Sequence, residues 1–91
     1  MRRIVWSSEA LDQLEEITAY VRGFSPQAAA RLEQRFVKVA NSLASLSERG
    51  RAIGGSRREI AIIQPYVLRY MVVDDEVTVL TIRHAARRPE A

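Results

Sequence analysis

The single histidine of the chain, His84, lies next to a group of arginines, and this part of the sequence is best suited to chemistry. The intrinsic pKa of imidazole lies near neutrality, so His84 could accept or donate a proton. Glu59 or Tyr66 could carry a second proton. Four arginines could hold a phosphate: Arg58, Arg69, Arg83 and Arg87. Metal-independent RNA cleavage needs such a set, namely a base for the 2′-hydroxyl, an acid for the leaving 5′-oxygen and cations around the phosphate.

Each of these residues also has a purely structural interpretation. His84 could be a strand-end residue that hydrogen-bonds the sheet, and Glu59 could pair with a neighbouring arginine, which is the interpretation we favour. Tyr66 and Tyr70 have the character of half-buried sheet aromatics. Three arginines near the end of the chain could be solvated or could bind an acidic or nucleic partner: Arg83, Arg87 and Arg88.

The composition excludes several other chemistries. The chain has one histidine and no cysteine, and its carboxylates do not cluster except at the turn around Asp74, so we expect no metal site. The glycine pair Gly54-Gly55 lacks the lysine and the serine or threonine of a phosphate-binding loop. Ser/His/Asp catalysis has no local signature. We therefore predict no cofactor.

The 91 residues are expected to form one domain spanning positions 1–91, and 47% hydrophobic and 27% charged residues are typical of a globular chain. The net charge is +3, and every basic residue except Lys38 is an arginine. The planar guanidinium fork suits carboxylates and phosphates. This composition therefore suits an acidic or nucleic partner, but a genome rich in G and C, which favours arginine codons, would produce the same bias.

No apolar run approaches the roughly 20 residues that a membrane span needs. The N-terminus is basic but turns polar after Trp6, which is too early for a signal peptide. The absence of cysteine fits the reducing cytoplasm, where we expect the protein to act.

The first part of the chain predicts a strand followed by two helices. Residues Arg2 to Trp6 are rich in β-forming types, and Ser7 or Ser8 can cap a helix that ends at Gly23. The first helix carries an apolar stripe at helical spacing: Leu11, Leu14, Ile17 or Thr18, and Val21.

Ser25-Pro26 begins the second helix, with serine as the N-cap and proline at the first helical position. Its apolar seam continues at steps of three and four: Ala29, Leu32, Phe36, Val39, Leu43 and Leu46. We expect this helix to end at Gly50. The seam could form a coiled-coil dimer, although in a small domain it more often packs into the core.

The second half predicts a loop and three strands. Ser47 to Arg58 reads as an arginine-rich loop, and the strands are Glu59 to Ile63, Tyr66 to Val73, and Val77 to Arg83. The register of the last hairpin depends on its turn. A two-residue turn at Asp74-Asp75 would place Tyr70 opposite Val79. A three-residue turn would place Tyr70 opposite Leu80 and Leu68 opposite Ile82. We favour the three-residue turn, because it keeps the charge of Arg69 away from the aliphatic face.

The expected order is strand, helix, helix, strand, strand, strand. An N-terminal strand and a helical hairpin would pack on a small, mostly antiparallel sheet. This is a two-layer α+β domain.

Several segments together resemble one family. They are VWSSEALDQLEEI (5–17), SPQAAARLEQRF (25–36), Arg58-Glu59, PYVLRY (65–70) and VLTIRHAAR (79–87). In this order the chain resembles the RelE/ParE toxin superfamily of bacterial toxin–antitoxin modules. The resemblance implies the fold described above and a cognate antitoxin that holds the toxin inactive. RelE-like members cut mRNA in the ribosomal A site, whereas ParE-like members poison DNA gyrase.

Details of the sequence favour the ParE-like branch. RelE-like nucleases typically have an arginine three positions before the tyrosine that matches Tyr70, and this chain has Val67 there. They often carry lysines before the second strand and a tyrosine near the C-terminus, which this chain lacks. The helix start at Ser25-Pro26, the pair Pro65-Tyr66 and the ending 84–87 look more like ParE. One missing contact to a transition-state phosphate can lower a rate by about 10²–10³.

The first hypothesis is therefore a toxin that binds DNA gyrase without covalent chemistry. Its target would be contacted by five arginines: Arg57, Arg58, Arg83, Arg87 and Arg88. The alternative is a ribosome-dependent mRNA endoribonuclease that uses four residues: His84, Glu59, Arg69 and Arg87. A third interpretation is an inactive member that only binds its antitoxin.

The partner that the resemblance implies is an acidic and apolar antitoxin segment that is disordered alone and wraps the domain as helix or strand. We expect it to form a hetero-oligomer with the toxin, through a set of residues on the basic rim of the sheet: Arg58, Tyr66, Arg69 and Arg83.

Overall fold

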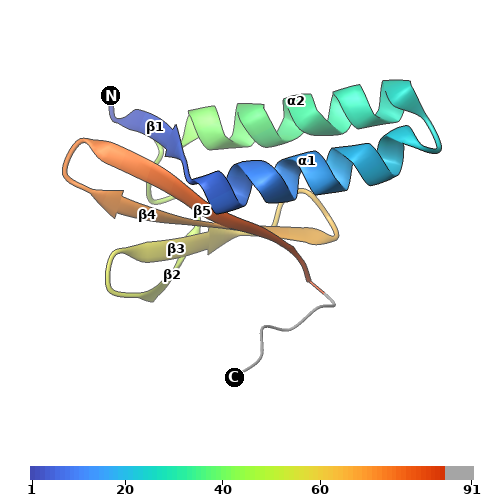
Figure 1. Ribbon diagram of the computed structural model, residues 1–91. Helices are drawn as coiled ribbons and strands as arrows, with labels where there is room; N and C mark the ends of the chain where they lie inside the picture. Colours follow the sequence, from blue (N-terminus) through green and yellow to red (C-terminus); the bar gives the residue numbers. More distant parts are fainter. Residues whose placement is uncertain (86–91) are drawn as a thin grey trace.

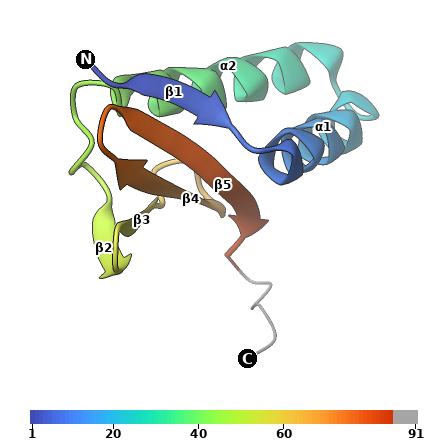
Figure 2. The same ribbon diagram turned by 60° about the vertical axis from the view of Figure 1, so that its left-hand side comes forward.

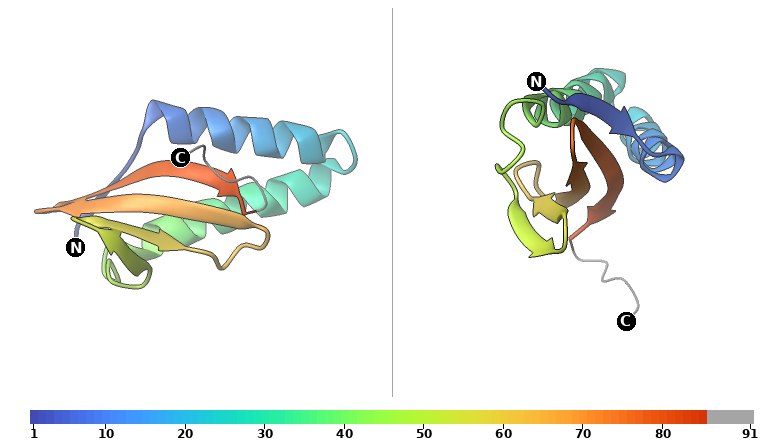
Figure 3. Two further views of the ribbon diagram at one scale, coloured as in Figure 1. Left: turned by 90° about the horizontal axis from the view of Figure 1, so that it is seen from below. Right: turned by 90° about the vertical axis from the view of Figure 1, so that its left-hand side faces the viewer.

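A computed structural model describes residues 1–85 of the chain. Its elements, in chain order, are β1 (Arg3–Trp6), α1 (Ser8–Arg22), α2 (Pro26–Ser42), β2 (Arg51–Gly54), β3 (Arg57–Ile60), β4 (Tyr66–Val73) and β5 (Glu76–His84). The two helices form a hairpin that covers one face of the sheet (Figure 1). The other face carries no helix (Figure 3). The predicted two-layer α+β fold is confirmed.

The five strands form one sheet in the order β1-β5-β4-β3-β2. β1 runs parallel to β5, and the other neighbours are antiparallel. The N-terminal strand therefore lies beside the last strand of the chain, as Figure 2 shows. The sheet is mostly antiparallel, as predicted, but has one strand more than predicted.

The predicted helix starts are confirmed. The Ser7 hydroxyl accepts a hydrogen bond from Ala10 N at 3.0 Å, and the Ser25 hydroxyl accepts one from Ala28 N at 3.1 Å. These bonds satisfy backbone N–H groups that have no partner within the first helical turn. Pro26 stands in the first turn of α2, and Gly23 ends α1 as predicted.

The second helix ends at Ser42 and not at Gly50, so its predicted end is wrong. Leu43 N donates to Ala40 O and the Ser42 hydroxyl donates to Val39 O, and both bonds close the last turn. Leu43 is still completely buried, because the chain follows the core as it leaves the helix. Leu46, also placed in the apolar seam, is 57% exposed. Leu11 of the α1 stripe is exposed as well.

The predicted loop of residues 47–58 contains an unpredicted strand, β2. Gly54 and Gly55 have φ angles of 125° and 58°, which suit glycine, and they make the turn that folds β2 back along β3. β3 consequently begins at Arg57 and ends at Ile60, two residues before the predicted start and three before the predicted end.

The hairpin of β4 and β5 combines the two registers considered above. Its turn is the two-residue one, because Val73 lies opposite Glu76 and Tyr70 opposite Val79. A β-bulge then shifts the register, so that Leu68 lies opposite Ile82. The preferred register is therefore wrong at Tyr70 and right at Leu68. A bulge inserts one unpaired residue into a strand, which sequence alternation does not reveal.

The core lies between the helix hairpin and the sheet. Its largest fully buried side chains include Tyr70, Phe36, Leu43, Val77 and Val79. Ile4 and Trp6 of β1 pack against it from the edge.

The buried hydroxyl of Tyr70 fixes the segment between α2 and β2. It donates to Ser47 O at 2.7 Å and accepts from Gly50 N at 2.9 Å. Arg58 Nη1 donates to Gly50 O at 2.7 Å. A Cβ atom at Gly50 would lie 2.6 Å from Glu59 O, so no larger residue fits there without displacing the backbone of β3.

Replacing Tyr70 by phenylalanine should therefore lower the free energy of unfolding by about 1–3 kcal/mol, since Gly50 N loses its buried acceptor. Chemical denaturation followed by circular dichroism measures this change. The matched control is Tyr20→Phe, because the Tyr20 side chain is 70% exposed. It should change the unfolding free energy by less than about 0.5 kcal/mol. Equal effects of the two substitutions would show that the Tyr70 hydroxyl does not hold this segment.

Candidate functional site

A row of four polar side chains crosses the helix-free face of the sheet. Arg51 of β2 lies opposite Glu59 of β3, Glu59 opposite Arg69 of β4, and Arg69 opposite Thr81 of β5. Side chains directly opposite one another in a sheet share a face. The neighbours of this row in β3 and β4, such as Ile60 and Leu68, are buried under the helices, so the row points away from them. We call these four residues the polar row.

Glu59 is the centre of the polar row. Its Oε2 accepts from Arg51 Nη2 at 2.6 Å and from Arg51 Nε at 3.0 Å. Its Oε1 accepts from Arg69 Nε at 3.2 Å. The Glu59 side chain is 14% exposed, whereas those of Arg51 and Arg69 are 76% and 39% exposed. The favoured interpretation of Glu59, an ion pair with a neighbouring arginine, is confirmed and extends to two arginines.

The environment of Glu59 lowers its pKa. Burial of the carboxyl acts to raise the pKa, but the hydrogen bonds from Arg51 and Arg69 and their positive charges outweigh it. The carboxyl of Glu59 is therefore an anion at neutral pH.

Two buried polar atoms of β5 lie at this end of the polar row, one on its member Thr81 and one on Arg83 beside it. Thr81 Oγ1 and Arg83 Nε are both buried, and neither has a hydrogen-bond partner within the described part of the chain. Thr81 and Arg83 are two residues apart on one strand, so both stand on the helix-free face. Buried donors without acceptors are rare in proteins. A binding partner could therefore place a hydrogen-bond acceptor against this part of the face.

The five arginines predicted to contact a target are divided among different places. Arg57 lies opposite Met71 and is exposed on the helix-free face, which it shares with Arg83. Arg58 lies opposite Tyr70 on the helix side, and its guanidinium donates to Gly50 O and Glu48 O. Arg58 therefore has a structural role that the sequence did not reveal. The predictions for Arg87 and Arg88 lie outside the described residues.

The residues predicted for RNA cleavage are only partly brought together, because Tyr66 and Arg83 line one pocket with His84 but Glu59 and Arg69 do not. His84 lies opposite Tyr66 with a ring-centroid distance of 5.6 Å, and Tyr66 contacts Phe36 of α2 at the same distance. His84 therefore stands on the helix side. Glu59 and Arg69 stand on the other face, so the sheet separates them from the imidazole. Arg87, the fourth residue of that set, lies outside the described residues.

The four residues predicted to bind the antitoxin are divided in the same way. Tyr66 and Arg58 stand on the helix side, whereas Arg69 and Arg83 stand on the helix-free face. Only Tyr66 and Arg83 of this set line the pocket described next.

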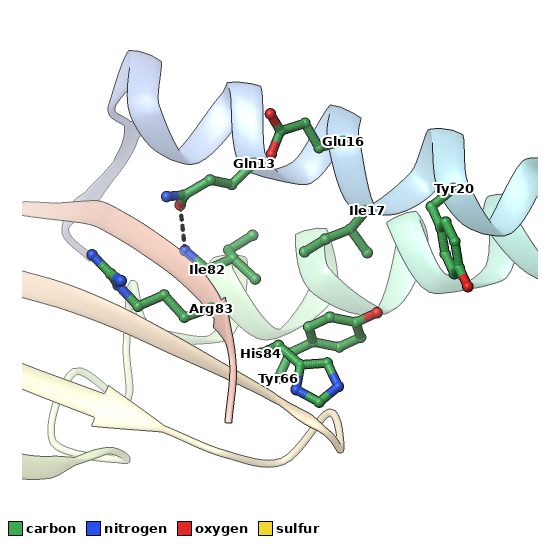
Figure 4. A pocket seen from close by; sticks show the side chains of 8 residues that line it. All are labelled: Gln13, Glu16, Ile17, Tyr20, Tyr66, Ile82, Arg83 and His84. Atoms are coloured by element: carbon green, nitrogen blue, oxygen red, sulfur yellow. Dashed lines mark hydrogen bonds between the residues drawn. The ribbon is translucent and has the colours of Figure 1, made fainter. Parts of the chain in front are cut away.

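A pocket of about 650 Å³ lies between α1 and the second half of β5 (Figure 4). We call it the α1–β5 pocket, and it is lined by Gln13, Glu16, Ile17, Tyr20, Tyr66, Ile82, Arg83 and His84. It exists because β1 pairs only with residues 76–79 of β5, so the rest of that edge has no neighbouring strand. The side chain of Gln13 takes the place of a strand there, and its Oε1 accepts from Ile82 N at 2.7 Å.

Sequence reasoning missed this pocket. Ile82 and Tyr66 were expected to be sheet residues and Ile17 a helix residue, but no local pattern joins α1 to the end of β5. The open edge results from the strand lengths, because β1 has four residues and β5 has nine. No sequence pattern indicated that these two strands pair.

Residues 1–85 contain neither a group of metal ligands nor a long apolar helix. No three histidine, cysteine, aspartate or glutamate side chains in this part of the chain are grouped so that they could hold a metal ion. No helix in the same residues is long and apolar enough to cross a membrane.

The lowered pKa of Glu59 leads to a prediction about acid stability. A carboxyl with a lowered pKa in the folded state stabilises the fold above its unfolded pKa, roughly 4.3. That contribution is lost as the pH falls through the folded pKa. Glu59→Gln should therefore lower the melting temperature at pH 7, by an amount that corresponds to about 1 kcal/mol or less. The difference from the unchanged protein should shrink as the pH falls.

Thermal unfolding followed by circular dichroism between neutral and acidic pH tests this expectation. The double variant Arg51→Gln, Arg69→Gln is the control, because it removes the two groups that lower the pKa. It should lose the same acid-sensitive contribution. A difference between Glu59→Gln and the unchanged protein that stays constant down to acid pH would rule out the assigned ion pairs.

Comparison with known proteins agrees with this fold. The family described as "ParE toxin of type II toxin-antitoxin system, parDE" matches residues 4–89. The protein named Toxin RelE2 of Caulobacter vibrioides is 45% identical over 87 residues, covering 96% of this chain and 99% of the relative. Putative toxin Y4kP of Sinorhizobium fredii is 36% identical over 86 residues, covering 92% of this chain and 88% of the relative.

Among solved structures, one described as the chromosomal ParDE TA system from P. aeruginosa matches with a TM-score of 0.77 at 21% identity. The match covers 92% of this chain and 96% of that one, and it supports the fold alone. The family match and the two relatives span nearly the whole sequence. The chain therefore belongs to the ParE toxin family, within the RelE/ParE superfamily of type II toxin–antitoxin systems.

Proposed function

We propose that this toxin inhibits DNA gyrase by binding to it, without covalent chemistry of its own. One observation carries the proposal. The sheet separates His84 from Glu59 and Arg69, so the favoured nuclease set of His84, Glu59, Arg69 and Arg87 is divided between the two faces in its described members. A proton carrier must lie within hydrogen-bond reach of the reacting group, and these side chains cannot reach one substrate from opposite faces.

The helix-free face is suited to contact with a protein. Arg57 and Arg83 lie on it, and arginine is enriched at protein interfaces because its fork binds carboxylates in a defined geometry. We assign these two residues to the contact with the target. Arg58 contributes less, because its guanidinium is already bonded to backbone carbonyls. Arg87 and Arg88 remain in the proposed contact set.

The alternative function is ribosome-dependent cleavage of mRNA. It is favoured by the name of the relative that is 45% identical, Toxin RelE2. In that case His84 would act from the helix side of the sheet.

The two functions differ in a direct experiment. We expect the purified toxin to inhibit supercoiling by gyrase and to leave mRNA on programmed ribosomes intact. Arg57→Glu should weaken the inhibition by about tenfold, since it reverses a charge at the contact. Arg31→Glu makes the same change at an exposed position of helix α2 and should have little effect. Cleaved A-site codons together with normal supercoiling would refute the gyrase proposal.

We further propose that the cognate antitoxin binds in the α1–β5 pocket as an extended segment. The open edge of β5 can take a further strand, because such edges present backbone groups to an added chain. Ile17, Tyr66 and Ile82 offer an apolar lining, and Arg83 offers a charge for an acidic side chain. An acidic and apolar segment of the antitoxin matches both features.

This proposal predicts that Tyr20→Ala weakens antitoxin binding. Tyr20 lines the pocket but is mostly exposed, so its truncation should leave the fold intact. Loss of an aromatic anchor typically costs about 1–2 kcal/mol, which corresponds to roughly tenfold in Kd. Isothermal titration calorimetry with the antitoxin encoded beside the toxin gene provides the measurement.

The control variant is Leu11→Ala, which shortens an exposed apolar residue of the same helix outside the pocket. It should leave the Kd within about twofold of the unchanged toxin. If both substitutions weaken binding equally, or neither does, the antitoxin binds elsewhere.

A further inference from the structure

We propose that Glu59 is a built-in anion that occupies a phosphate-binding position on the helix-free face and keeps nucleic acid away from it. Two arginines from the strands on either side of β3 converge on its one carboxylate. Carboxylates and phosphates are the two anions for which the arginine fork is shaped. The place of the Glu59 carboxylate is therefore also the place where a phosphate oxygen would be bound.

The surroundings of Glu59 have the other components of an anion site. Thr81 lies opposite Arg69 in the polar row, and its buried hydroxyl has no partner within residues 1–85. Arg83 Nε, two residues further along β5, is also buried and also has no hydrogen-bond partner within residues 1–85. Four donor side chains thus stand on neighbouring strands of one face. Glu59 supplies the acceptor for two of them, Arg51 and Arg69.

Glu59 differs from an ordinary surface ion pair. Glu76 also pairs with an arginine, Arg3, at 3.1 Å, but this pair lies at the β1 edge of the sheet and involves one guanidinium. Glu59 is largely buried in the row and holds two. A fixed negative charge at this position repels a phosphodiester backbone, and it also occupies the donors that would attract one. Glu59 thus acts as a specificity determinant against polyanions.

Removal of the carboxylate should consequently create affinity for nucleic acid. We expect Glu59→Gln to bind a fluorescein-labelled single-stranded RNA of about twelve nucleotides roughly tenfold more tightly than the unchanged protein. Fluorescence anisotropy of the full chain measures this change. Two additional phosphate contacts should also steepen the dependence of log K on log salt by about 1.4.

The matched control is Glu76→Gln. It removes the same charge and also deprives an arginine of its carboxylate, but outside the polar row. It should change RNA affinity by no more than about twofold. The combined variant Glu59→Gln, Arg69→Gln should lose most of the gain. Equal gains for Glu59→Gln and Glu76→Gln would overturn the proposal, because net charge alone would then account for the binding. The absence of any gain for Glu59→Gln would overturn it as well, because the carboxylate would then mask no phosphate-binding position.

A second experiment compares Arg69→Gln with Arg57→Gln, so its result does not depend on whether the Glu59→Gln variant folds. If Glu59 masks Arg69, then Arg69→Gln should leave the weak RNA affinity of the otherwise unchanged protein as it is. Arg57 is exposed on the same face and has no carboxylate partner within the described residues. Arg57→Gln should therefore lower that affinity. An equal loss for both substitutions would show that Glu59 masks nothing. Neither gyrase nor ribosomes enter these assays, so they test Glu59 independently of the toxin's target.

Discussion

The pairing of β4 with β5 is the constraint on which the rest of this structure depends. The bulge in this hairpin keeps Val77, Val79 and Ile82 all buried under the helices, although strict alternation would turn Ile82 to the other face. The same shift places Thr81 on the helix-free face beside Arg69. The burial of Ile82 and the place of Thr81 in the polar row thus both follow from one local irregularity.

Features that depend on neighbouring residues could be predicted from the sequence. The serine caps, the proline at the start of α2 and the alternation along β4 are local, and the structure confirms them. The missed features depend on residues far apart in the chain. The path from α2 to β2 is fixed by Tyr70, which bonds Ser47 and Gly50 from another strand. The separation of His84 from Glu59 likewise depends on which face each strand presents, and a bulge alters that without changing the composition.

The number of arginines in the sequence overstates how many of them are available to bind a partner. Arg58 holds backbone carbonyls, and Arg51 and Arg69 share one carboxylate. Arg57 is the clearest case of a described arginine that stands exposed on the helix-free face without such an engagement. Three of the described arginines on β2 to β4 are therefore engaged within the molecule and offer less charge to a partner than their number indicates. This distribution fits recognition of a particular protein surface better than general attraction to polyanions.

The bond between Gln13 and the backbone of Ile82 has a consequence for assembly. An uncovered strand edge invites pairing with any other chain, including another copy of the same protein. The Ser7 hydroxyl already occupies Leu80 O on this edge, and the Gln13 amide occupies Ile82 N. An added strand must displace the Gln13 amide before its own backbone can bond to Ile82 N. That exchange removes one hydrogen bond, worth about 1 kcal/mol, from the net gain of every competitor. Non-specific pairing of another chain with this edge is thereby disfavoured. A partner that also fills the α1–β5 pocket gains enough contact to offset the lost hydrogen bond.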